Sequence, residues 1–335
     1  MNILVTGGLG FIGSHTVVTL IEQGFKVVIA DNLSNSKIDV LKGLKYITNE
    51  NIPFYQIDVA DEEAVNRLFE KHKFNGVIHF AGYKAVGESV TDPLKYYKNN
   101  LLSTMTLADV CQKKGVKKFI FSSSATVYGA NQVPFNEEMK LLSTTNTYGE
   151  TKAMCERILS DVAHANSDFK IALLRYFNPI GAHPSGVIGE SPNGIPNNLM
   201  PFVTQVAKGK LKELQIFGGD YPTRDGTGVR DYIHIMDLAE GHVAALENIK
   251  SGVHTYNLGT GQGTSVLEFI KTFERVNNIN IPYSIVARRQ GDIAFSYADV
   301  SKAKRELNWV AKRNLDHMCR DAWNFEKSNF EKFNI

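Results

Sequence analysis

The chain has 335 residues, 43% of them hydrophobic and 21% charged, as is typical of a soluble globular protein with more than one lobe. Its formal net charge of +2 gives no reason to expect nucleic acid or a membrane surface as a partner. No apolar run is long enough to span a bilayer, no leader peptide is recognisable, and the three cysteines and nine histidines follow no disulfide or metal pattern. We expect a reduced, cytoplasmic protein that binds no metal.

Short apolar runs alternate with amphipathic stretches along the first half of the chain. The expected strands are 2–7, 25–31, 52–59, 76–82, 117–124 and 169–178. Helical patterns lie between them at 11–24, 61–72, 99–114 and 148–165. Strands that are apolar on both faces and alternate with helices indicate a parallel sheet covered on both sides. The sequence therefore predicts an α/β fold with a doubly wound parallel (Rossmann) sheet.

The pattern changes after Asn178. Residues 179–198 contain four prolines and four glycines and should form an irregular, functional loop, and a second glycine-rich loop is expected at 217–232. The last third of the chain combines strand patterns at 213–217, 253–259 and 282–287 with helical patterns at 235–248, 265–276, 300–307 and 315–328. We expect a Rossmann domain formed by 1–178 and a returning segment at about 231–260, and a smaller mixed α/β domain formed by 179–230 and 261–335.

The first strand runs directly into Gly7, Gly10 and Gly13, spaced G-x-x-G-x-x-G, where a helix opens. Glycines in this context allow a tight turn and the close approach of a pyrophosphate to the helix N-terminus, whose amides and dipole favour an anion. The second strand ends in Asp31, 18 residues after Gly13. A carboxylate at this place binds the adenosine ribose 2′-hydroxyl and would repel a 2′-phosphate. The pattern predicts NAD as cofactor in preference to NADP.

Further candidate groups follow the carboxyl ends of the next strands, where doubly wound sheets bind their ligands. Asp58 and Val59 end the third strand and are placed to flank the adenine. Lys84 follows the fourth strand, within reach of the nicotinamide ribose or of a substrate phosphate. The fourth strand itself ends in a backbone segment that would pass beside the pyrophosphate, Phe80-Ala81-Gly82.

Tyr148 stands four residues before Lys152 at the start of a helix, so that the two side chains share one face. A cation there favours the phenolate and lets a tyrosine exchange a proton near neutral pH. The fifth strand ends in Ser124, which would lie beside this pair at the same edge of the sheet. This constellation resembles the extended short-chain dehydrogenase/reductase superfamily. The resemblance implies that Lys152 holds the nicotinamide ribose and lowers the tyrosine pKa, while Tyr148 moves the hydroxyl proton.

Longer motifs narrow the resemblance. "VTGGLGFIGSHT", "HFAGYKAVGES", "FSSSATVYG", "LRYFNPIGAHPSG" and "ARRQGDIAFSYADVSKAKRELNW" are similar to the UDP-galactose 4-epimerase family, and the likeness runs from residue 1 to about residue 325. It implies an isomerase that epimerises UDP-hexoses through a transient 4-keto sugar with tightly held NAD. The implied cofactor-binding residues are Gly7, Gly10, Phe11, Ile12, Gly13, Asp31, Asn32, Asn35, Asp58, Val59, Phe80, Ala81, Gly82, Lys84, Asn99, Ser122, Tyr148, Lys152 and Tyr176. The implied substrate-binding residues are Lys84, Ser124, Tyr148, Asn178, Asn198, Leu199, Phe217, Arg230, Arg289, Asp292 and Ser296, with Ser124, Tyr148 and Lys152 as the catalytic set.

Other nucleotide-sugar enzymes share the cofactor turn and the Tyr-Lys pair. A 4,6-dehydratase carries Asp-Glu just before "VYG" as its acid and base, and a UDP-glucuronate decarboxylase usually has glutamate at the second position. This chain has Ala125 and Thr126 there, which disfavours both. A UDP-glucuronate 4-epimerase and an ordinary dehydrogenase that releases NADH at each turnover remain open. A non-catalytic NAD-sensing module would have no need for the Ser-Tyr-Lys set.

Two further expectations concern substrate range and assembly. Alignment with the family places Ser296 beside the hexose 2-substituent, where enzymes restricted to unacetylated sugars have tyrosine. A small residue there implies that UDP-GlcNAc and UDP-GalNAc are accepted too, unless Phe295 or Tyr297 fills the space. Related epimerases pair the helices at 99–114 and 148–165 in a homodimer. These helices carry more apolar residues than one sheet contact needs, namely Leu101, Leu102, Met105, Leu107, Met154, Ile158 and Leu159.

Overall fold

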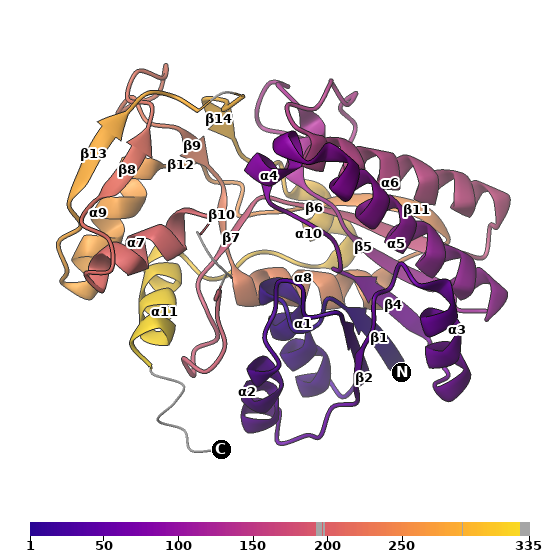
Figure 1. The fold of residues 1–335 in the computed structure, drawn as a ribbon. Coiled ribbons are helices and arrows are strands. Elements are labelled where there is room, and N and C mark those ends of the chain that lie inside the picture. The colour runs from indigo at the N-terminus through magenta and orange to yellow at the C-terminus, as the bar shows by residue number, and fades with distance from the viewer. Residues whose placement is uncertain (192–195, 197, 290, 329–335) are drawn as a thin grey trace.

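The computed structural model describes residues 1–191, 196, 198–289 and 291–328. Within these residues, the larger lobe is built on a seven-stranded sheet with the order β11-β6-β5-β4-β1-β2-β3, and every neighbouring pair is parallel (Figure 1). The strands are β1 (Asn2–Thr6), β2 (Lys26–Asp31), β3 (Phe54–Gln56), β4 (Gly76–His79), β5 (Lys118–Ser122), β6 (Lys170–Tyr176) and β11 (Gly252–Leu258). The doubly wound α/β fold predicted from the sequence is confirmed.

Helices cover both faces of this sheet (Figure 1). One face is covered by α1 (Phe11–Glu22), α2 (Asp39–Thr48) and α8 (Ile235–Asn248), and the other by α3 (Glu62–Lys71), α5 (Pro93–Lys113) and α6 (Thr147–Ala165). Successive strand residues point to opposite faces, so Ile3 and Val5 of β1 pack on the α1 side, whereas Leu4 packs on the α3 side. Because both faces are buried, the strands are apolar throughout.

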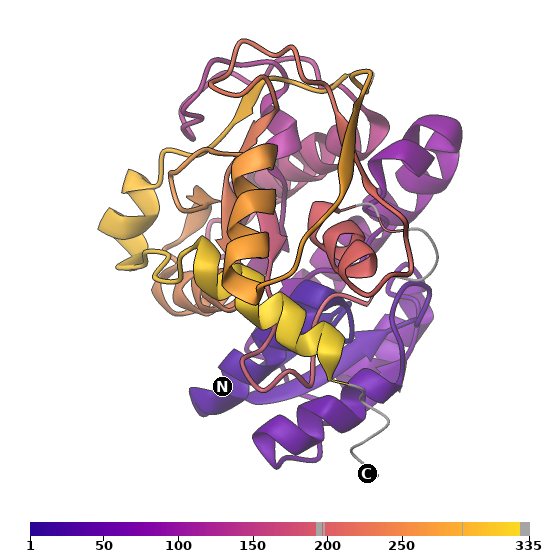
Figure 2. The same cartoon turned by 90° about the vertical axis from the view of Figure 1, so that its left-hand side faces the viewer.

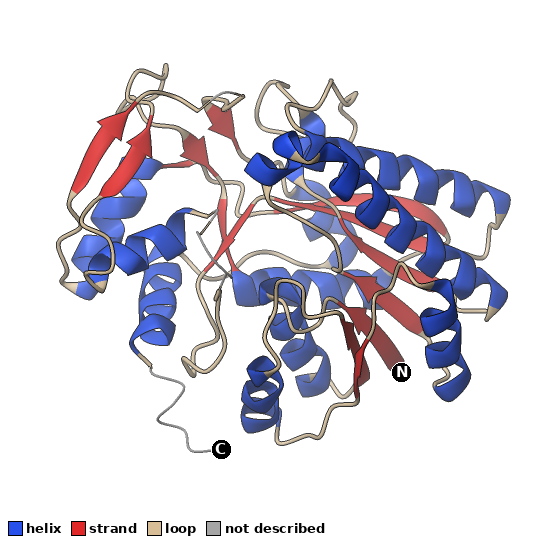
Figure 3. Cartoon of the chain, in the orientation of Figure 1, coloured by secondary structure: helices blue, strands red, loops and turns tan. Residues whose placement is uncertain are grey.

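The smaller lobe has a core of its own (Figure 3). It is formed by α7 (Leu199–Ala207), α9 (Val266–Asn277) and α11 (Leu315–Lys327) against two parallel strands, β8 (Leu214–Phe217) and β13 (Tyr283–Val286). Figure 2 shows α9 in orange and α11 in yellow on the outer side of this lobe. A three-stranded sheet of β12 (Thr264–Ser265), β9 (Val229–Arg230) and β14 (Phe295–Ser296) lies on the side toward the larger lobe.

The chain passes between the two lobes more than once. After β6 it forms β7 (Asn178–Ile180), which pairs in parallel with β10 (Tyr232–His234). From β10 it returns through α8 to β11, which pairs with β6 along its whole length at the edge of the large sheet. The remaining elements are α4 (Val86–Thr91), a 3-10 helix η1 (Ala125–Tyr128) and α10 (Ser301–Leu307).

Several local expectations are wrong. The helix expected at 99–114 begins at Pro93, because Asp92 caps it by accepting a hydrogen bond from the Lys95 amide at 3.3 Å. The strand expected at 52–59 covers only Phe54–Gln56, and α2, α4 and α7 were not foreseen.

The loop expected at 179–198 is also not wholly irregular, because Pro179 and Ile180 belong to β7. The Asn178 amide donates to Asp231 O in front of β10, so the nitrogen of Pro179 points away from that strand and no ladder bond is lost. Residues 192–195 and 197 of this loop lie outside the described part of the chain.

Candidate active site

The glycine turn joins β1 to α1. Gly7 has φ of +67°, and a Cβ on Gly13 would lie 2.2 Å from the Gly7 carbonyl oxygen, so neither position accepts a side chain without distortion. Phe11, Ile12 and Gly13 open α1, and the N-cap Gly10 offers no side-chain acceptor to their amides. These free amides and the positive end of the helix fit a phosphate group.

Asp31 lies at the end of β2 and faces this turn. One carboxylate oxygen accepts from the Leu9 amide at 3.1 Å, and the other accepts from the Leu33 amide at 2.9 Å and the Ser36 hydroxyl at 2.8 Å. The carboxylate is buried and fixed in orientation beside the glycine turn. This is the placement that recognition of an adenosine ribose requires.

The ends of β2 and β3 meet beside Asp31. The Asn32 amide group donates to Asp58 at 3.4 Å, and Val59 is buried next to it. Asn35 is exposed on the loop after β2. The structure thus brings Asn32, Asp58 and Val59 together but leaves Asn35 without a position fixed by packing.

The backbone after β4 runs close to the glycine turn. A Cβ on Gly7 would lie 2.8 Å from the Ala81 nitrogen, so Phe80, Ala81 and Gly82 border the turn as expected. Lys84 follows, and its Nζ lies 3.4 Å from Glu190 Oε1 of the smaller lobe. Glu190 was not foreseen, because its partner is distant in the sequence.

Ser124, Tyr148 and Lys152 come together at the carboxyl ends of β5 and β6. Tyr148 and Lys152 share the buried face of α6, and the Lys152 Nζ lies 5.9 Å from the centroid of the Tyr148 ring. Lys152 donates to the Ser122 carbonyl oxygen at 2.6 Å. The Ser124 hydroxyl accepts from the amide and the hydroxyl of Thr126, at 3.2 and 2.9 Å.

Burial dominates the ionisation of this group. It raises the pKa of Tyr148 to about 12, against the opposing effect of a hydrogen bond from Ser124. It lowers the pKa of Lys152 to about 8. Lys152 is not among the causes of the Tyr148 shift, since its ammonium group is directed at the Ser122 carbonyl, and its expected effect on the tyrosine pKa stays a prediction.

The start of α6 is fixed from two sides. Asn146 caps the helix by accepting from the Gly149 amide at 2.8 Å, and Ser89 of α4 accepts from the Tyr148 amide at 3.1 Å. Ser89 therefore helps to place Tyr148. Since no pattern predicted α4, this contact could not be predicted either.

The other residues implied near the nicotinamide lie along β5, β6 and α5. The hydroxyls of Ser122 and Tyr176 share a short hydrogen bond, and both side chains are buried. Asn99 is partly exposed on α5. Ser122 and Tyr176 thus belong to the Ser-Tyr-Lys group, whereas Asn99 makes no hydrogen bond to it among the described residues.

A second group of candidate residues gathers on the smaller lobe. Asp292 lies 3.0 Å from Arg289 Nε and 3.7 Å from the Arg230 guanidinium. The Arg289 guanidinium stacks 4.9 Å from the centroid of the Phe217 ring. Ser296 on β14 pairs in register with Arg230 on β9. Five of the implied substrate residues therefore form one cluster.

Asn178, Asn198 and Leu199 lie between the two groups. Asn178 opens β7, Asn198 is the N-cap of α7, and Leu199 is the first residue of that helix. The Asn198 side chain donates to Glu190 Oε1 at 2.6 Å, the same oxygen that faces Lys84. Glu190 thereby connects a residue implied in cofactor binding with one implied in substrate binding.

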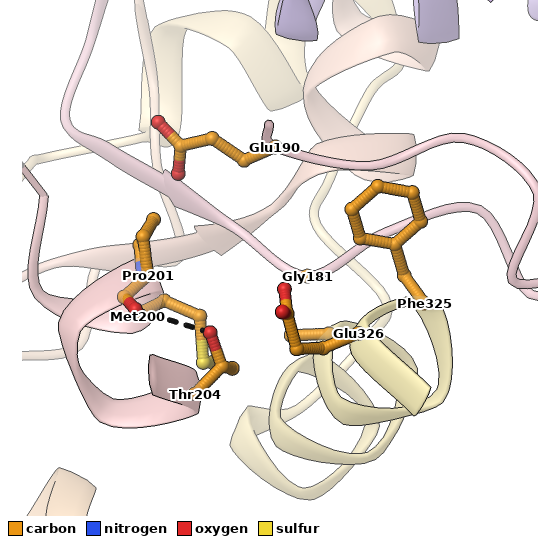
Figure 4. Close-up of a pocket in the computed structure, with 8 residues that line it drawn as sticks. Gly181, Glu190, Met200, Pro201, Thr204, Phe325 and Glu326 are labelled. Carbon is orange, nitrogen blue, oxygen red and sulfur yellow. Dashed lines mark hydrogen bonds between the residues drawn. The ribbon is translucent and has the colours of Figure 1, made fainter. Parts of the chain in front are cut away.

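A small cavity lies behind this contact (Figure 4). Its volume of about 10 Å³ corresponds to one water molecule. Glu190 Oε2 is buried without a hydrogen-bond partner among the described residues. The cavity is lined by Gly181, Glu190, Met200, Pro201, Thr204, Ala322, Phe325 and Glu326.

Metal-ligating clusters and membrane-spanning helices are absent from the described part of the chain. There, no group of three or more His, Cys, Asp and Glu side chains is arranged to hold a metal ion. No described helix has both the length and the apolar character to cross a membrane. Cys111, Cys155 and Cys319 are buried free thiols.

The glycine turn, the carboxylate after β2 and the Ser-Tyr-Lys group define a dinucleotide-dependent enzyme of the short-chain dehydrogenase/reductase type. The model of the NAD dependent epimerase/dehydratase family matches residues 3–259. The UDP-glucose 4-epimerase of Bacillus subtilis (strain 168) is 58% identical over 332 residues, 98% of each chain.

Two solved structures extend this likeness. The UDP-glucose 4-epimerase from Bifidobacterium longum in complex with NAD+ and UDP has a TM-score of 0.96 and 52% identity, with 99% of this chain and 100% of that chain covered. The UDP-Glc/GlcNAc 4-epimerase from Campylobacter jejuni has a TM-score of 0.84 and 37% identity, with 97% and 99% covered. The chain belongs to the NAD dependent epimerase/dehydratase family and, within it, to the UDP-glucose 4-epimerases. The resemblance stated from the motifs is confirmed.

Proposed function

We propose that this chain is an isomerase that interconverts UDP-galactose and UDP-glucose with NAD as its cofactor. The observation that carries the proposal is the meeting of Ser124, Tyr148 and Lys152 at the strand ends beside the glycine turn. The names of its relatives agree, since the Bacillus subtilis protein is a UDP-glucose 4-epimerase and the Bifidobacterium longum structure contains NAD+ and UDP.

NAD, when bound, supplies a reversible hydride acceptor for C4 of the hexose. The first amides of α1 would hold its pyrophosphate, the Asp31 carboxylate its adenosine ribose, and the Lys152 ammonium its nicotinamide ribose. We assign this part to residues 1–178 and 231–260, and the sugar nucleotide to 179–230 and 261–335.

Tyr148 acts as the group that takes the proton from the 4-hydroxyl and returns it. The hydroxyl of Ser124 accepts two hydrogen bonds from Thr126, so its own proton, directed at Tyr148 without substrate, can be donated to the sugar O4 when substrate is bound. A donor at that oxygen stabilises charge that develops as the 4-ketone forms and reverts. Burial raises the pKa of Tyr148 and so disfavours the loss of its proton. A positive charge beside the ring during turnover would lower this pKa again.

The cluster on the smaller lobe anchors the UDP. Asp292 orients Arg289 and Arg230, whose planar guanidinium groups suit two oxygens of a diphosphate. Phe217 offers an exposed ring for the uracil, together with Asn178, Asn198 and Leu199 nearby. Anchoring the nucleotide while the hexose is held loosely lets the 4-keto sugar turn and take back hydride on its opposite face.

The assay for this proposal is incubation of the purified chain with UDP-galactose, with products resolved by NMR. We expect UDP-glucose to form without added NAD and without release of NADH. Accumulating NADH would instead identify a dehydrogenase that releases its cofactor. Parallel incubation with UDP-glucuronate tests the related 4-epimerase, and conversion of that substrate alone would overturn the proposal.

We further propose that the enzyme also interconverts UDP-GlcNAc and UDP-GalNAc. Support comes from β14, where neighbouring residues point to opposite sides. The ring of Tyr297 packs toward Gly263, since a Cβ on Gly263 would lie 3.2 Å from its Cδ1. Ser296 then points the other way, and its small side chain leaves room for an acetamido group. The Campylobacter jejuni relative carries GlcNAc in its name.

Ser296→Tyr is the test of this substrate range. We expect the variant to lose turnover of the N-acetylated pair and to keep that of the unacetylated pair, because a ring occupies the space of the acetamido group. Ser296→Ala is the matched control and should keep both. A wild type inert toward UDP-GlcNAc and UDP-GalNAc would refute this extension.

We also propose a cytoplasmic homodimer. The free thiols suit a reducing compartment. On α5, Leu102 and Met105 are 47% and 43% exposed, and Leu94 continues the same exposed stripe. Leu107 and Leu159, expected in the same surface, are instead fully buried in the core of the larger lobe, because they lie on the sheet-facing sides of their helices. Light scattering at micromolar concentration should give twice the chain mass, and Leu102→Glu should reduce it.

A further inference from the structure

A buried ion pair joins β6 to α6 next to the Ser-Tyr-Lys group. Arg175 of β6 donates from Nε and Nη2 to the two oxygens of Glu156 on α6, at 2.9 and 2.6 Å. Their side chains are only 6% and 5% exposed. The same carboxylate accepts from the Ser123 hydroxyl at 2.6 Å. Neither charge takes part in binding or catalysis as proposed above.

Both members of the pair are joined to the Ser-Tyr-Lys group. Glu156 follows Lys152 by one helical turn on α6. Arg175 precedes Tyr176, whose hydroxyl bonds to Ser122, and Lys152 donates to the carbonyl of that same Ser122. The pair therefore connects α6, β5 and β6 at the place where the three elements deliver these side chains.

We propose that Glu156 and Arg175 are positioning residues for the reaction. Glu156 stabilises the charged form of Lys152. Arg175 fixes the orientation of the Glu156 carboxylate and partly offsets its attraction for the Lys152 ammonium group. This rests on the function proposed for Lys152. It adds an electrostatic role for two side chains that would touch neither substrate nor cofactor.

Stability alone is a poor explanation for this pair. Charges taken from water lose their hydration, and well-packed hydrocarbon of similar size is often at least as stabilising as a buried ion pair. What a buried pair does offer is a strong local field, because little water is present to screen it. Lys152, also buried, lies within that field.

The other groups around Lys152 do not supply a negative charge. From α6 it faces Tyr148 and Cys155, from β4 His79, and from β5 the ring of Phe121 at 4.8 Å. Tyr176 of β6 bonds to Ser122, the residue whose carbonyl Lys152 contacts. Burial raises the pKa values of Tyr148, Cys155 and Tyr176, so these three stay neutral near pH 7. Burial and the nearby Lys152 lower the pKa of His79 to about 3, so this ring is neutral too. Among these groups, Glu156 is the anion.

The consequence for Lys152 has a definite sign. Burial lowers its pKa to about 8, and Cys155 and Glu156 act in the opposite direction; since burial keeps the Cys155 thiol neutral near pH 7, Glu156 is the group of the two that is charged there. Removing the Glu156 charge while Arg175 stays should let Lys152 lose its proton at lower pH. Removing the Arg175 charge while Glu156 stays should make Lys152 keep its proton to higher pH.

The experiment compares Glu156→Gln, Arg175→Met and the double variant Glu156→Gln/Arg175→Met. We measure the alkaline fall of kcat with UDP-galactose and, independently of activity, the pH above which NAD is lost on gel filtration. In Glu156→Gln both should move down by about one pH unit, and in Arg175→Met both should move up. The double variant should lie between the single variants, near the wild type.

A merely structural role predicts something else. Both single variants would then lower kcat and melting temperature, with the pH limits unmoved or moved in the same direction, and that result overturns the inference. If Glu156→Gln does not fold, two observations still test the inference. The pH limits should rise in Arg175→Met, and they should fall back toward the wild-type values in the double variant. Glu150→Gln and Arg157→Met are matched controls, because they break an exposed ion pair on the same helix and should shift neither limit. A wild type without epimerase activity would refute the proposed function and not this pair.

Discussion

The cofactor side and the substrate side of the candidate site are built in different ways. On the cofactor side, the glycine backbone and the buried Asp31 lie at the ends of strands of the large sheet, and the buried Lys152 lies on the long helix α6 that covers this sheet. On the substrate side, Phe217 is 38% exposed and the side chain of Arg289 57% exposed, on short strands and loops. The difference indicates a cofactor held in a preformed cradle, and a substrate bound by groups that water can still reach.

The largest effect is expected from Tyr148→Phe, at the centre of the buried half. The variant loses only the hydroxyl that moves the proton, so kcat should fall by about 10²–10⁴-fold. NAD content and melting temperature should remain those of the wild type. A variant with more than about a tenth of the wild-type kcat would contradict the role of Tyr148 as base.

The next effect is a loss of stability at low pH, which arises from buried histidines of the larger lobe. Burial lowers the pKa values of His15 and His79 to about 3 and that of His242 to about 4, whereas the unfolded value is near 6.5. Below pH 6.5 the unfolded chain binds more protons than the folded one, so stability is fully present above pH 6.5 and is lost as the pH falls. The three together should reduce the free energy of unfolding by about 4 kcal/mol per pH unit near pH 5.

Urea unfolding at several pH values between 5 and 7.5 measures this slope. His242→Asn should remove about a third of it, because one of the three histidines is gone. His15 and His242 each donate from Nδ1 to a helix carbonyl, and the Nε2 of His242 is buried without a hydrogen-bond partner among the described residues. An uptake of less than one proton on unfolding at pH 5 would show that these rings are charged in the folded chain.

Gly13→Ala tests the rigidity of the cofactor cradle. Its Cβ would lie 2.2 Å from the Gly7 carbonyl oxygen, and both atoms belong to packed backbone. Such crowding costs about 1–3 kcal/mol, so NAD affinity should fall by about 5- to 150-fold. Gly87→Ala is the control, since its Cβ would meet nothing within 4 Å and should leave NAD binding unchanged. Equal NAD retention in both variants would contradict a preformed cradle.

The smallest effect is expected from Arg289→Met, on the substrate side of the site. Arg289→Met removes one charge that water already screens, so KM for UDP-galactose should rise about tenfold with kcat nearly unchanged. Arg224→Met serves as control, because that arginine is 82% exposed and pairs with Glu268 away from the cluster. An equal rise of KM in both variants would mean that general charge, and no specific contact, attracts the substrate.

Local patterns were sufficient to predict the cofactor half. Glycine spacing, the carboxylate after β2 and the (i, i+4) pair Tyr148 and Lys152 are short-range signals, and the parallel sheet brings their ends together. The start of α5 could also have been read, since Asp92 and Pro93 are a cap and a first helical residue.

The sequence was less informative where contacts join distant segments. Lys84 and Glu190 are 106 residues apart, and the Tyr148 amide meets Ser89 59 residues away. The hydrophobic periodicity of a sequence carries no signal for contacts between such distant residues. In α7, Pro201 lies within the first turn, where a proline is tolerated, although a proline usually signals the end of a helix.

The position of β11 has a consequence for folding during synthesis on the ribosome. Strand β6 is complete once Tyr176 has been made, but the neighbour that covers its outer edge is not finished before Leu258. Throughout the synthesis of the intervening segment, the nascent sheet presents a row of unpaired amides and carbonyls on an apolar strand. Such an edge can pair with another chain, so until β11 is made the strand β6 is open to incorrect pairing, which a sheet built in chain order would avoid.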